Sequence, residues 1–256
     1  MKDLFSVAGK VAVVTGGSTG IGAMIARGFV ENGARTYITA RKPDLLEATQ
    51  KELSELGECI AIQSDLSTMD GLAAFADEVL AKEDKIDILI NNAGATWGAD
   101  VDEFPESGWD KVMDLNVKSI FFLTQRFLGA LRAAGSLEDP ARVVNIASIN
   151  GITHPGMNNY SYSASKAAVI QLTRHLAADL AADHININGI APGFFPSKMT
   201  KHLLDHEEEM KKGIPTRNLG QPEDAAGTAI YLCSRASNYI CGHTIVMDGG
   251  MVAQAG

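Results

Sequence analysis

The chain has little cysteine and little excess positive charge. Its three cysteines, Cys59, Cys233 and Cys241, are odd in number and form no Cys-x-x-Cys pair. This pattern argues against a disulfide scaffold or a zinc motif, and we interpret the cysteines as reduced thiols. The 31 Asp and Glu residues outnumber the 22 Lys and Arg residues, for a formal net charge of -9. An acidic chain is not expected to bind nucleic acid or an anionic membrane surface.

Long hydrophobic runs and linkers are also missing. The segment 1–5 has no apolar signal region, and no apolar run approaches the length of a membrane-spanning helix. We find no Pro/Ser-rich linker, low-complexity tract or fixed-period repeat, so we expect one cytoplasmic domain over residues 1–256. No metal is expected, because the histidines lack metal-ligand spacing. They are His154, His175, His184, His202, His206 and His243.

What the chain does have is a regular alternation of short β-branched runs with longer segments of helical periodicity. We expect strands at 11–14, 36–39, 60–62, 86–90, 143–146, 185–187 and 244–247. Helices are expected at 20–32, 43–56, 69–83, 108–133, 160–182 and 222–233. Buried strands separated by helices predict parallel βαβ units. The expected fold is therefore an α/β doubly wound (Rossmann) sheet, mostly parallel and seven-stranded, with helices on both faces.

A glycine-rich turn lies between the first expected strand and helix. Residues 15–22 read Thr-Gly-Gly-Ser-Thr-Gly-Ile-Gly, with the spacing G-x-x-x-G-x-G. Such glycines allow backbone N–H groups to approach a pyrophosphate at a helix N-terminus. A turn without a ligand is the alternative, but the strand-turn-helix context favours a dinucleotide. The expected contacts are Gly16, Ser18, Thr19, Gly20, Ile21 and Gly22.

The end of the second strand indicates which dinucleotide binds. An acidic residue there would bind the ribose hydroxyls, whereas an arginine accommodates a 2′-phosphate. Here Arg41 follows the strand and no carboxylate appears before Asp44. A solvated surface arginine is the alternative, but the missing acid favours NADP(H).

Two further strand ends are candidates for cofactor contacts. Asp65 and Leu66 follow the third strand, where they could meet an adenine ring or simply lie on the surface. Asn92, Ala93 and Gly94 follow the fourth strand, where they could pack around a cofactor or form a plain turn.

The segment most informative about chemistry is Tyr162-Ser163-Ala164-Ser165-Lys166. A helix places a tyrosine and a lysine four residues apart on one face. A neighbouring cation favours the phenolate, so we expect the pKa of Tyr162 to be lowered toward the working range. Tyr160 lacks this cation, because Ala164 stands four residues later. With Ser148 at a strand end, these residues predict hydride transfer between a nicotinamide and a carbonyl or alcohol.

In order and approximate spacing, these motifs resemble those of the short-chain dehydrogenase/reductase family, over essentially the whole chain. The residues that carry the likeness are 15–22, 91–94, Asn116, Ser148, Tyr162, Lys166 and Pro192-Gly193. Within the family the chain resembles 3-oxoacyl-[acyl-carrier-protein] reductases of the rhamnolipid-pathway type. Similarity to sugar-acid and cyclic-alcohol dehydrogenases is almost as close.

The resemblance implies a role for each matching catalytic residue. Tyr162 would be the general acid in reduction and the base in oxidation, and Lys166 would lower its pKa and hold the nicotinamide ribose. Ser148 would hydrogen-bond the substrate oxygen. Asn116 would anchor a water that connects Lys166 to solvent.

The resemblance also implies cofactor contacts from Pro192, Gly193, Phe195 and Ser197, the last standing where the family has threonine. It further implies a homotetramer, or at least a dimer. The helical stretch 116–131 supports this assembly, because its aromatic and apolar residues exceed what one buried face needs. They are Ile120, Phe121, Phe122, Phe127 and Leu128.

The segment 193–220 follows the sixth strand end, where ligands bind in such sheets. We expect it to be a substrate lid, with its run Glu207-Glu208-Glu209 on a solvated helix face. Phe194, Phe195 and Met199 predict an apolar pocket, and Trp97 and Met157 either line it or pack in the core.

The predicted activity is NADP(H)-dependent interconversion of a small-molecule ketone and a secondary alcohol, most of all of a 3-oxoacyl thioester. A catabolic dehydrogenase of a cyclic alcohol or sugar acid is the first alternative. A non-catalytic NADP-sensing regulator and a sugar-nucleotide epimerase are less favoured.

Overall fold

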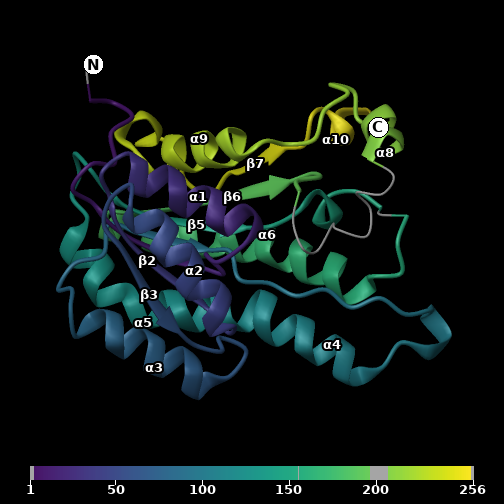
Figure 1. Cartoon of the computed structure of the whole chain (residues 1–256), viewed down its shortest axis with the longest axis horizontal. Coiled ribbons are helices and arrows are strands. Elements are labelled where there is room, and N and C mark those ends of the chain that lie inside the picture. Colours follow the sequence, from purple (N-terminus) through teal and green to yellow (C-terminus); the bar gives the residue numbers. More distant parts are fainter. Residues whose placement is uncertain (1–2, 155, 197–206, 255–256) are drawn as a thin grey trace.

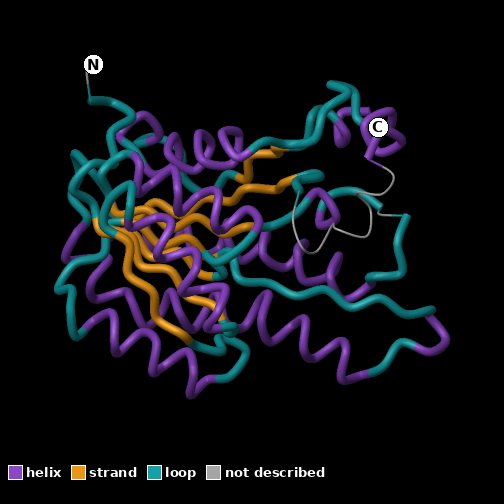
Figure 2. The backbone as a smooth tube through the Cα atoms, viewed as in Figure 1, coloured by secondary structure: helices purple, strands orange, loops and turns teal. Residues whose placement is uncertain are grey.

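The structure, a computed structural model, describes residues 3–154, 156–196 and 207–254. Within this part a seven-stranded sheet has the order β3-β2-β1-β4-β5-β6-β7, and each neighbouring pair is parallel (Figures 1 and 2). The strands are β1 Val11–Thr15, β2 Arg35–Ala40, β3 Cys59–Gln63, β4 Ile88–Asn91, β5 Ala141–Ile146, β6 Ile185–Pro192 and β7 Thr244–Met247. The strand order reverses between β1 and β4. A doubly wound sheet opens its ligand crevice at such a point.

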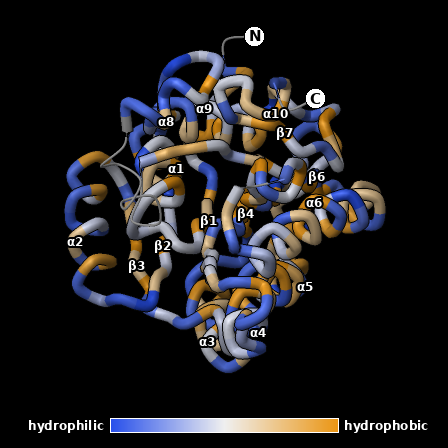
Figure 3. Tube along the Cα trace, turned by 90° about the vertical axis from the view of Figure 1, so that its right-hand side faces the viewer, coloured by the Kyte–Doolittle hydropathy of each residue, from blue (hydrophilic) through white to orange (hydrophobic). Residues whose placement is uncertain are grey.

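Helices cover both faces of this sheet. Figure 3 shows α1 and α9 on one side of the strands and α3, α4 and α5 on the other. The helices are α1 Gly20–Glu31, α2 Pro43–Ser54, α3 Met69–Leu80, α4 Glu106–Met113, α5 Ser119–Ala134, α6 Tyr160–Leu180, α8 Glu207–Gly213, α9 Pro222–Cys233 and α10 Met251–Gln254. The predicted Rossmann-type single domain is confirmed.

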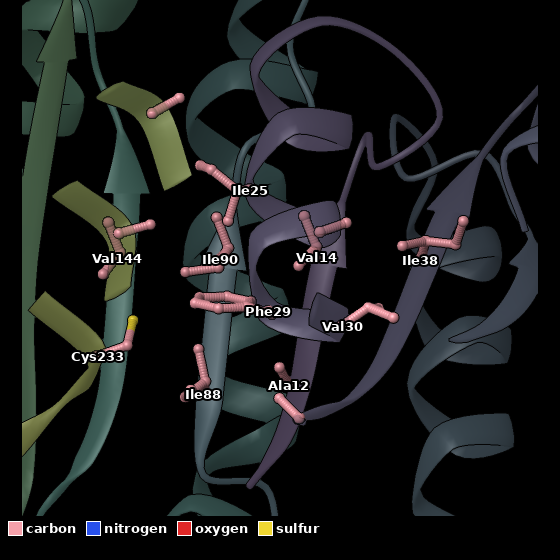
Figure 4. Packing of buried hydrophobic residues seen from close by; sticks show 14 of the residues in the cluster. Ala12, Val14, Ile25, Phe29, Val30, Ile38, Ile88, Ile90, Val144 and Cys233 are labelled. Carbon is pink, nitrogen blue, oxygen red and sulfur yellow. The ribbon is translucent and has the colours of Figure 1, made fainter. Parts of the chain in front are cut away.

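Strand residues alternate between two hydrophobic cores, because successive side chains of a strand point to opposite faces. Ala12 and Val14 of β1 pack with Ile25 and Phe29 of α1 in the first core (Figure 4). Val13, between them, belongs to the second core, which α3, α5 and α6 complete. The central strands β1, β4, β5 and β6 are thus buried on both faces, whereas the edge strands β3 and β7 are partly exposed.

The predicted helix at 108–133 differs from the structure in one respect. It consists of α4 and α5, joined by a π-helical turn at Asp114–Lys118. A π turn inserts a wider loop into a helix and often occurs at functional sites. Here it contains Asn116, whose side chain is fully buried.

The expected lid lies partly within the described residues. Residues 193–196 and 207–220 are described, and Phe194 and Phe195 line the large cavity of the molecule. The return segment is bound to the first part, because the Gly220 backbone N–H donates to the Phe194 carbonyl at 3.0 Å. Ser197, Met199, Leu203 and Leu204 lie outside the described residues.

Candidate active site

The cavity occupies about 1070 Å³ at the carboxyl ends of the central strands. Its wall includes almost every predicted site residue that the structure describes. These are Gly16, Ser18, Thr19, Gly20, Ile21, Arg41, Asp65, Leu66, Asn92, Ala93, Gly94, Ser148, Tyr162, Lys166, Pro192, Gly193 and Phe195. Gly22 and Asn116 are not among the residues that line the cavity.

The glycine-rich turn leaves the N-terminus of α1 open to the cavity. Gly16 and Gly20 have φ angles of 64° and 57°, which side chains disfavour. Thr19 precedes the helix without capping it through its side chain, and the first turn contains no acidic residue. The free N–H groups of such a helix end attract an anion.

Gly22 is closely packed against neighbouring segments and is not among the residues that line the cavity. A Cβ atom built at this position would overlap the Asn92 side-chain amide and the Gly16 carbonyl. The Asn92 Nδ2 donates to the Thr15 carbonyl at 2.8 Å, and the Thr15 Oγ1 accepts from the Asn92 backbone N–H at 2.9 Å. These bonds join the glycine turn to the end of β4.

Arg41 and Asp65 lie beside each other at the ends of β2 and β3. The Arg41 guanidinium is 3.9 Å from the Asp65 carboxylate, and both side chains are about half exposed, at 55% and 43%. Burial alone would raise the pKa of Asp65, but hydrogen bonds from Ser67 and the charge of Arg41 together lower it. The Ser67 N–H and hydroxyl both donate to the Asp65 Oδ1, so one oxygen of this carboxylate already has hydrogen-bond partners within the protein.

Ser148, Tyr162 and Lys166 come together in the wall of the cavity. Ser148 follows β5 in extended backbone conformation, and its Oγ accepts from the Asn150 N–H at 3.2 Å. The Lys166 Nζ lies 5.5 Å from the centroid of the Tyr162 ring and donates to the Ile146 carbonyl at 2.7 Å. Lys166 is only 4% exposed, and this burial lowers its pKa to about 8.

The tyrosine differs from the prediction made for it. Burial raises the pKa of Tyr162, and a hydrogen bond with Ser148 opposes the change without reversing it. The Lys166 ammonium is itself desolvated, and it donates its hydrogen bond to the Ile146 carbonyl. The phenol is therefore protonated at neutral pH, which suits a group that donates a proton.

Asn116, in the π-helical turn, connects this turn to the loop after β4 and to α6. Its Oδ1 accepts from the Ala95 N–H at 2.8 Å, and its Nδ2 donates to the Ala95 carbonyl at 3.0 Å and to the Ser165 Oγ at 2.9 Å. Both amide N–H donors are thus used within the protein. The side chain fixes the loop after β4 to the helix that carries Tyr162.

Several participating residues were not identified from the sequence. Ser165 completes the Asn116 contacts, and it lies within the Tyr-x-x-x-Lys segment itself. The Asn145 Oδ1 of β5 accepts a hydrogen bond from the Asn91 Nδ2 at 2.9 Å, and the Asn145 Nδ2 donates to the Thr173 Oγ1 at 3.0 Å. Because Thr173 follows Lys166 on α6, these bonds attach that helix to the sheet. Polar residues inside otherwise apolar strands are the signal that could have indicated this network.

The described residues contain no group of three or more His, Cys, Asp or Glu side chains arranged to hold a metal ion. Within the same residues, no helix has both the length and the apolar character needed to span a membrane.

The chain belongs to the short-chain dehydrogenase/reductase family and is an oxidoreductase. A family model described as Enoyl-(Acyl carrier protein) reductase matches residues 16–252. The chain is 46% identical over 253 residues to the rhamnolipids biosynthesis 3-oxoacyl-[acyl-carrier-protein] reductase of Pseudomonas aeruginosa, covering 98% of this chain and 99% of that protein. It is 38% identical over 256 residues to the 2-dehydro-3-deoxy-D-gluconate 5-dehydrogenase of Escherichia coli, covering 98% of each.

A solved structure agrees with this assignment. The Pseudomonas aeruginosa RhlG/NADP active-site complex superposes with a TM-score of 0.95 at 46% identity, covering 98% of this chain and 100% of that one. The family resemblance read from the sequence is confirmed.

Proposed function

We propose that the chain is an NADP(H)-dependent reductase of carbonyl compounds, with 3-oxoacyl thioesters as its preferred substrate class. The observation that carries the proposal is the convergence of Ser148, Tyr162 and Lys166 in one cavity with the open N-terminus of α1. Relatives named as a 3-oxoacyl-[acyl-carrier-protein] reductase and as an NADP complex support it.

The residues of the cavity fit a phosphorylated dinucleotide. The uncapped end of α1 offers N–H groups to a pyrophosphate, and Gly16, which has a positive φ and no side chain, leaves the backbone of the turn accessible to it. Arg41, with its loose ion pair to Asp65, has donors left for a 2′-phosphate. Leu66 and Asp65 would border the adenine, and Lys166 would hold the nicotinamide ribose.

The protein residues then supply binding and proton transfer. Bound at this site, the nicotinamide supplies a hydride in reduction and accepts one in oxidation. Ser148 donates a hydrogen bond to the substrate oxygen, which stabilises the negative charge that develops there. Tyr162 gives its proton to the same oxygen in reduction and removes it in oxidation.

Lys166 has two states near neutrality, because its pKa of about 8 lies close to the working range. We propose that it restores the proton to Tyr162 through a water held beside Asn116. Since the amide donors of Asn116 are occupied, an oxygen of that residue would hold the water.

A dehydrogenase of a sugar acid is the second candidate. The identity to a 2-dehydro-3-deoxy-D-gluconate 5-dehydrogenase extends over the same length of chain as the identity to the reductase. Oxidation of the alcohol uses the same three residues in reverse, so the geometry alone supports either direction.

The deciding experiment compares substrates with the purified protein. NADPH oxidation is followed with an acetoacetyl thioester, a cyclic ketone, a diketone and a keto sugar acid, and NADH is tested beside NADPH. We expect turnover of the thioester and a higher kcat/KM with NADPH. NADPH binding without turnover of any carbonyl would instead favour a nucleotide-sensing regulator.

Three further features belong to the same proposal. We propose that the enzyme is cytoplasmic. We propose that it forms a homotetramer or dimer, with the partly exposed residues Phe121 and Phe122 of α5 in the subunit interface. We also propose that the segment 193–220 is a substrate lid. Light scattering tests the assembly. Protease sensitivity with and without cofactor and substrate tests the lid, and no change in cleavage would argue against it.

A further inference from the structure

The charged residues of the cavity wall are unevenly placed. Arg41, Lys42 and Asp65 lie at the ends of β2 and β3, where the proposed cofactor phosphate binds. Lys166 is buried at the centre and bound to the Ile146 carbonyl. The remaining charge among the wall residues that the structure describes is Lys111, from the last turn of α4.

Lys111 rests on the face of an indole. Its Nζ lies 5.0 Å from the centroid of the Trp97 ring. The indole can approach α4 this closely because Gly108 has no side chain, and a Cβ atom there would come within 2.7 Å of the ring. Gly108 and Lys111 are three residues apart, so they share the helix face that covers Trp97.

This arrangement positions the ammonium without neutralising it. A cation–π contact leaves the charge and the N–H donors of a lysine available to a ligand. Among the residues that the structure describes, Lys111 forms no ion pair and no side-chain hydrogen bond. Neighbouring acids such as Glu103, Glu106 and Asp110 are exposed, and none of them lines the cavity.

The wall that includes Lys111 is joined to the segment that leads into the catalytic helix. The Ala99 N–H donates to the Asn158 carbonyl at 3.1 Å, and the Asn158 Nδ2 donates to the Asp100 carboxylate at 2.7 Å. Gly98, Met157 and Asn159 line the cavity beside these bonds. Since this segment starts the helix of Tyr162, the wall is on the substrate side.

We propose that Lys111 is a specificity-determining residue that binds an anionic group of the substrate, remote from the carbonyl being reduced. The proposal rests on the proposed function, and it narrows the substrate class to carbonyl compounds that carry a phosphate or a carboxylate. Both groups accept charge-assisted hydrogen bonds from an ammonium. A phosphate would belong to the carrier arm of an acyl thioester, and a carboxylate to a sugar acid.

The test uses substrates that share a reacting group and differ in charge. Acetoacetyl-coenzyme A carries phosphates, the acetoacetyl thioester of N-acetylcysteamine is neutral, and 5-keto-D-gluconate carries a carboxylate. For Lys111→Gln we expect KM to rise about tenfold for an anionic substrate, the size expected for losing a charge-assisted hydrogen bond. The kcat, the KM of the neutral thioester and the NADPH affinity should stay within twofold.

Two variants make the result specific. Lys111→Arg keeps the charge and should restore most of the affinity. Lys82→Gln removes an equal charge from an exposed lysine that does not line the cavity, and it should change no KM. A rise confined to the coenzyme A substrate identifies a phosphate ligand, and a rise confined to the keto acid identifies a carboxylate.

The remaining outcomes separate this inference from the proposed function. Turnover with unchanged KM values in Lys111→Gln overturns the inference alone. So does an equal rise for the neutral thioester, or a wild-type enzyme that turns over only the neutral thioester. Absence of turnover with every carbonyl overturns the proposed function and this inference with it.

Discussion

The Lys166 ammonium lies 5.5 Å from the centre of the Tyr162 ring, yet its hydrogen bond goes to the Ile146 carbonyl and not to the phenol. The two side chains are one helical turn apart on α6 and point into the same cavity. Because the ammonium is buried, its pKa falls to about 8, while burial raises the pKa of Tyr162. The tyrosine therefore keeps its proton at neutral pH, and the lysine is the group whose pKa lies near 8.

Replacing Tyr162 by Phe tests the proton donor. We expect kcat to fall by a factor of about 10²–10⁴, the usual contribution of a positioned acid or base. The NADPH affinity, measured by fluorescence titration, should change less than threefold. Tyr160→Phe is the matched control, since Tyr160 is 40% exposed and packs on Phe104 outside the cavity wall. Near-normal turnover in Tyr162→Phe would remove Tyr162 from the mechanism.

Lys166→Met tests the buried ammonium through stability. The pKa of Lys166 is about 8 in the folded protein and about 10.4 for an unperturbed lysine. Between these values the unfolded chain binds a proton that the folded chain does not, so the unfolding free energy of the wild type gains up to about 1.4 kcal/mol per pH unit. Below pH 8 both states are charged, and burying the ammonium remains a cost.

The measurement is urea unfolding of both proteins from pH 7.5 to 9.5. The wild-type free energy of unfolding should rise relative to that of Lys166→Met across this range. The raised pKa values of the Cys59 and Cys233 thiols have the opposite effect, but they are common to both proteins and cancel in the difference. Parallel profiles would show that Lys166 does not titrate near pH 8.

Arg41→Gln tests cofactor selection. The guanidinium is half exposed and 3.9 Å from Asp65, so it can turn to a ligand phosphate without breaking a strong pair. Loss of one charge-assisted contact should lower kcat/KM for NADPH by about 10- to 100-fold. The value for NADH should change less than threefold, because NADH has no 2′-phosphate. An equal fall in kcat/KM with NADPH and with NADH would mean that Arg41 does not bind the 2′-phosphate.

The fold could be predicted from sequence because its determinants are local and repeated. Strands buried on both faces are rich in apolar residues, so β1 was identifiable from the run at 11–14. The strand expected at 185–187 is shorter than β6, which extends to Pro192, because Asn188 and Gly189 interrupt the apolar pattern. The Tyr162 and Lys166 pair was predictable for a similar reason, since four-residue spacing in a helix fixes a common face. The expected strand at 86–90 starts only at Ile88, because the Ile86 N–H donates to the Ala130 carbonyl instead.

The remaining features depend on contacts between distant segments. The π turn around Asn116 is stabilised by bonds to Ala95 and Ser165, which are 21 and 49 residues away. The contact of Lys111 with Trp97 exists because Gly108 leaves room for an indole from a separate loop. The pKa values of Tyr162 and Lys166 depend on burial, which residue spacing does not encode. These properties arise only when the folded chain brings distant residues together.

Gly22→Ala tests whether close packing around the glycine turn holds that turn in the conformation that binds the cofactor. An added methyl group would overlap the Asn92 amide and the Gly16 carbonyl, so the turn must shift. We expect NADPH affinity to fall at least tenfold and the unfolding free energy to drop by about 1–3 kcal/mol, as for other overpacked sites.

Gly227→Ala is the control, since Gly227 lies in α9 with no atom within 4 Å of an added Cβ. That change should leave binding intact and stabilise the helix by up to about 1 kcal/mol. Unchanged affinity and stability in Gly22→Ala would show that the turn tolerates a side chain and that the Asn92 contact does not constrain it.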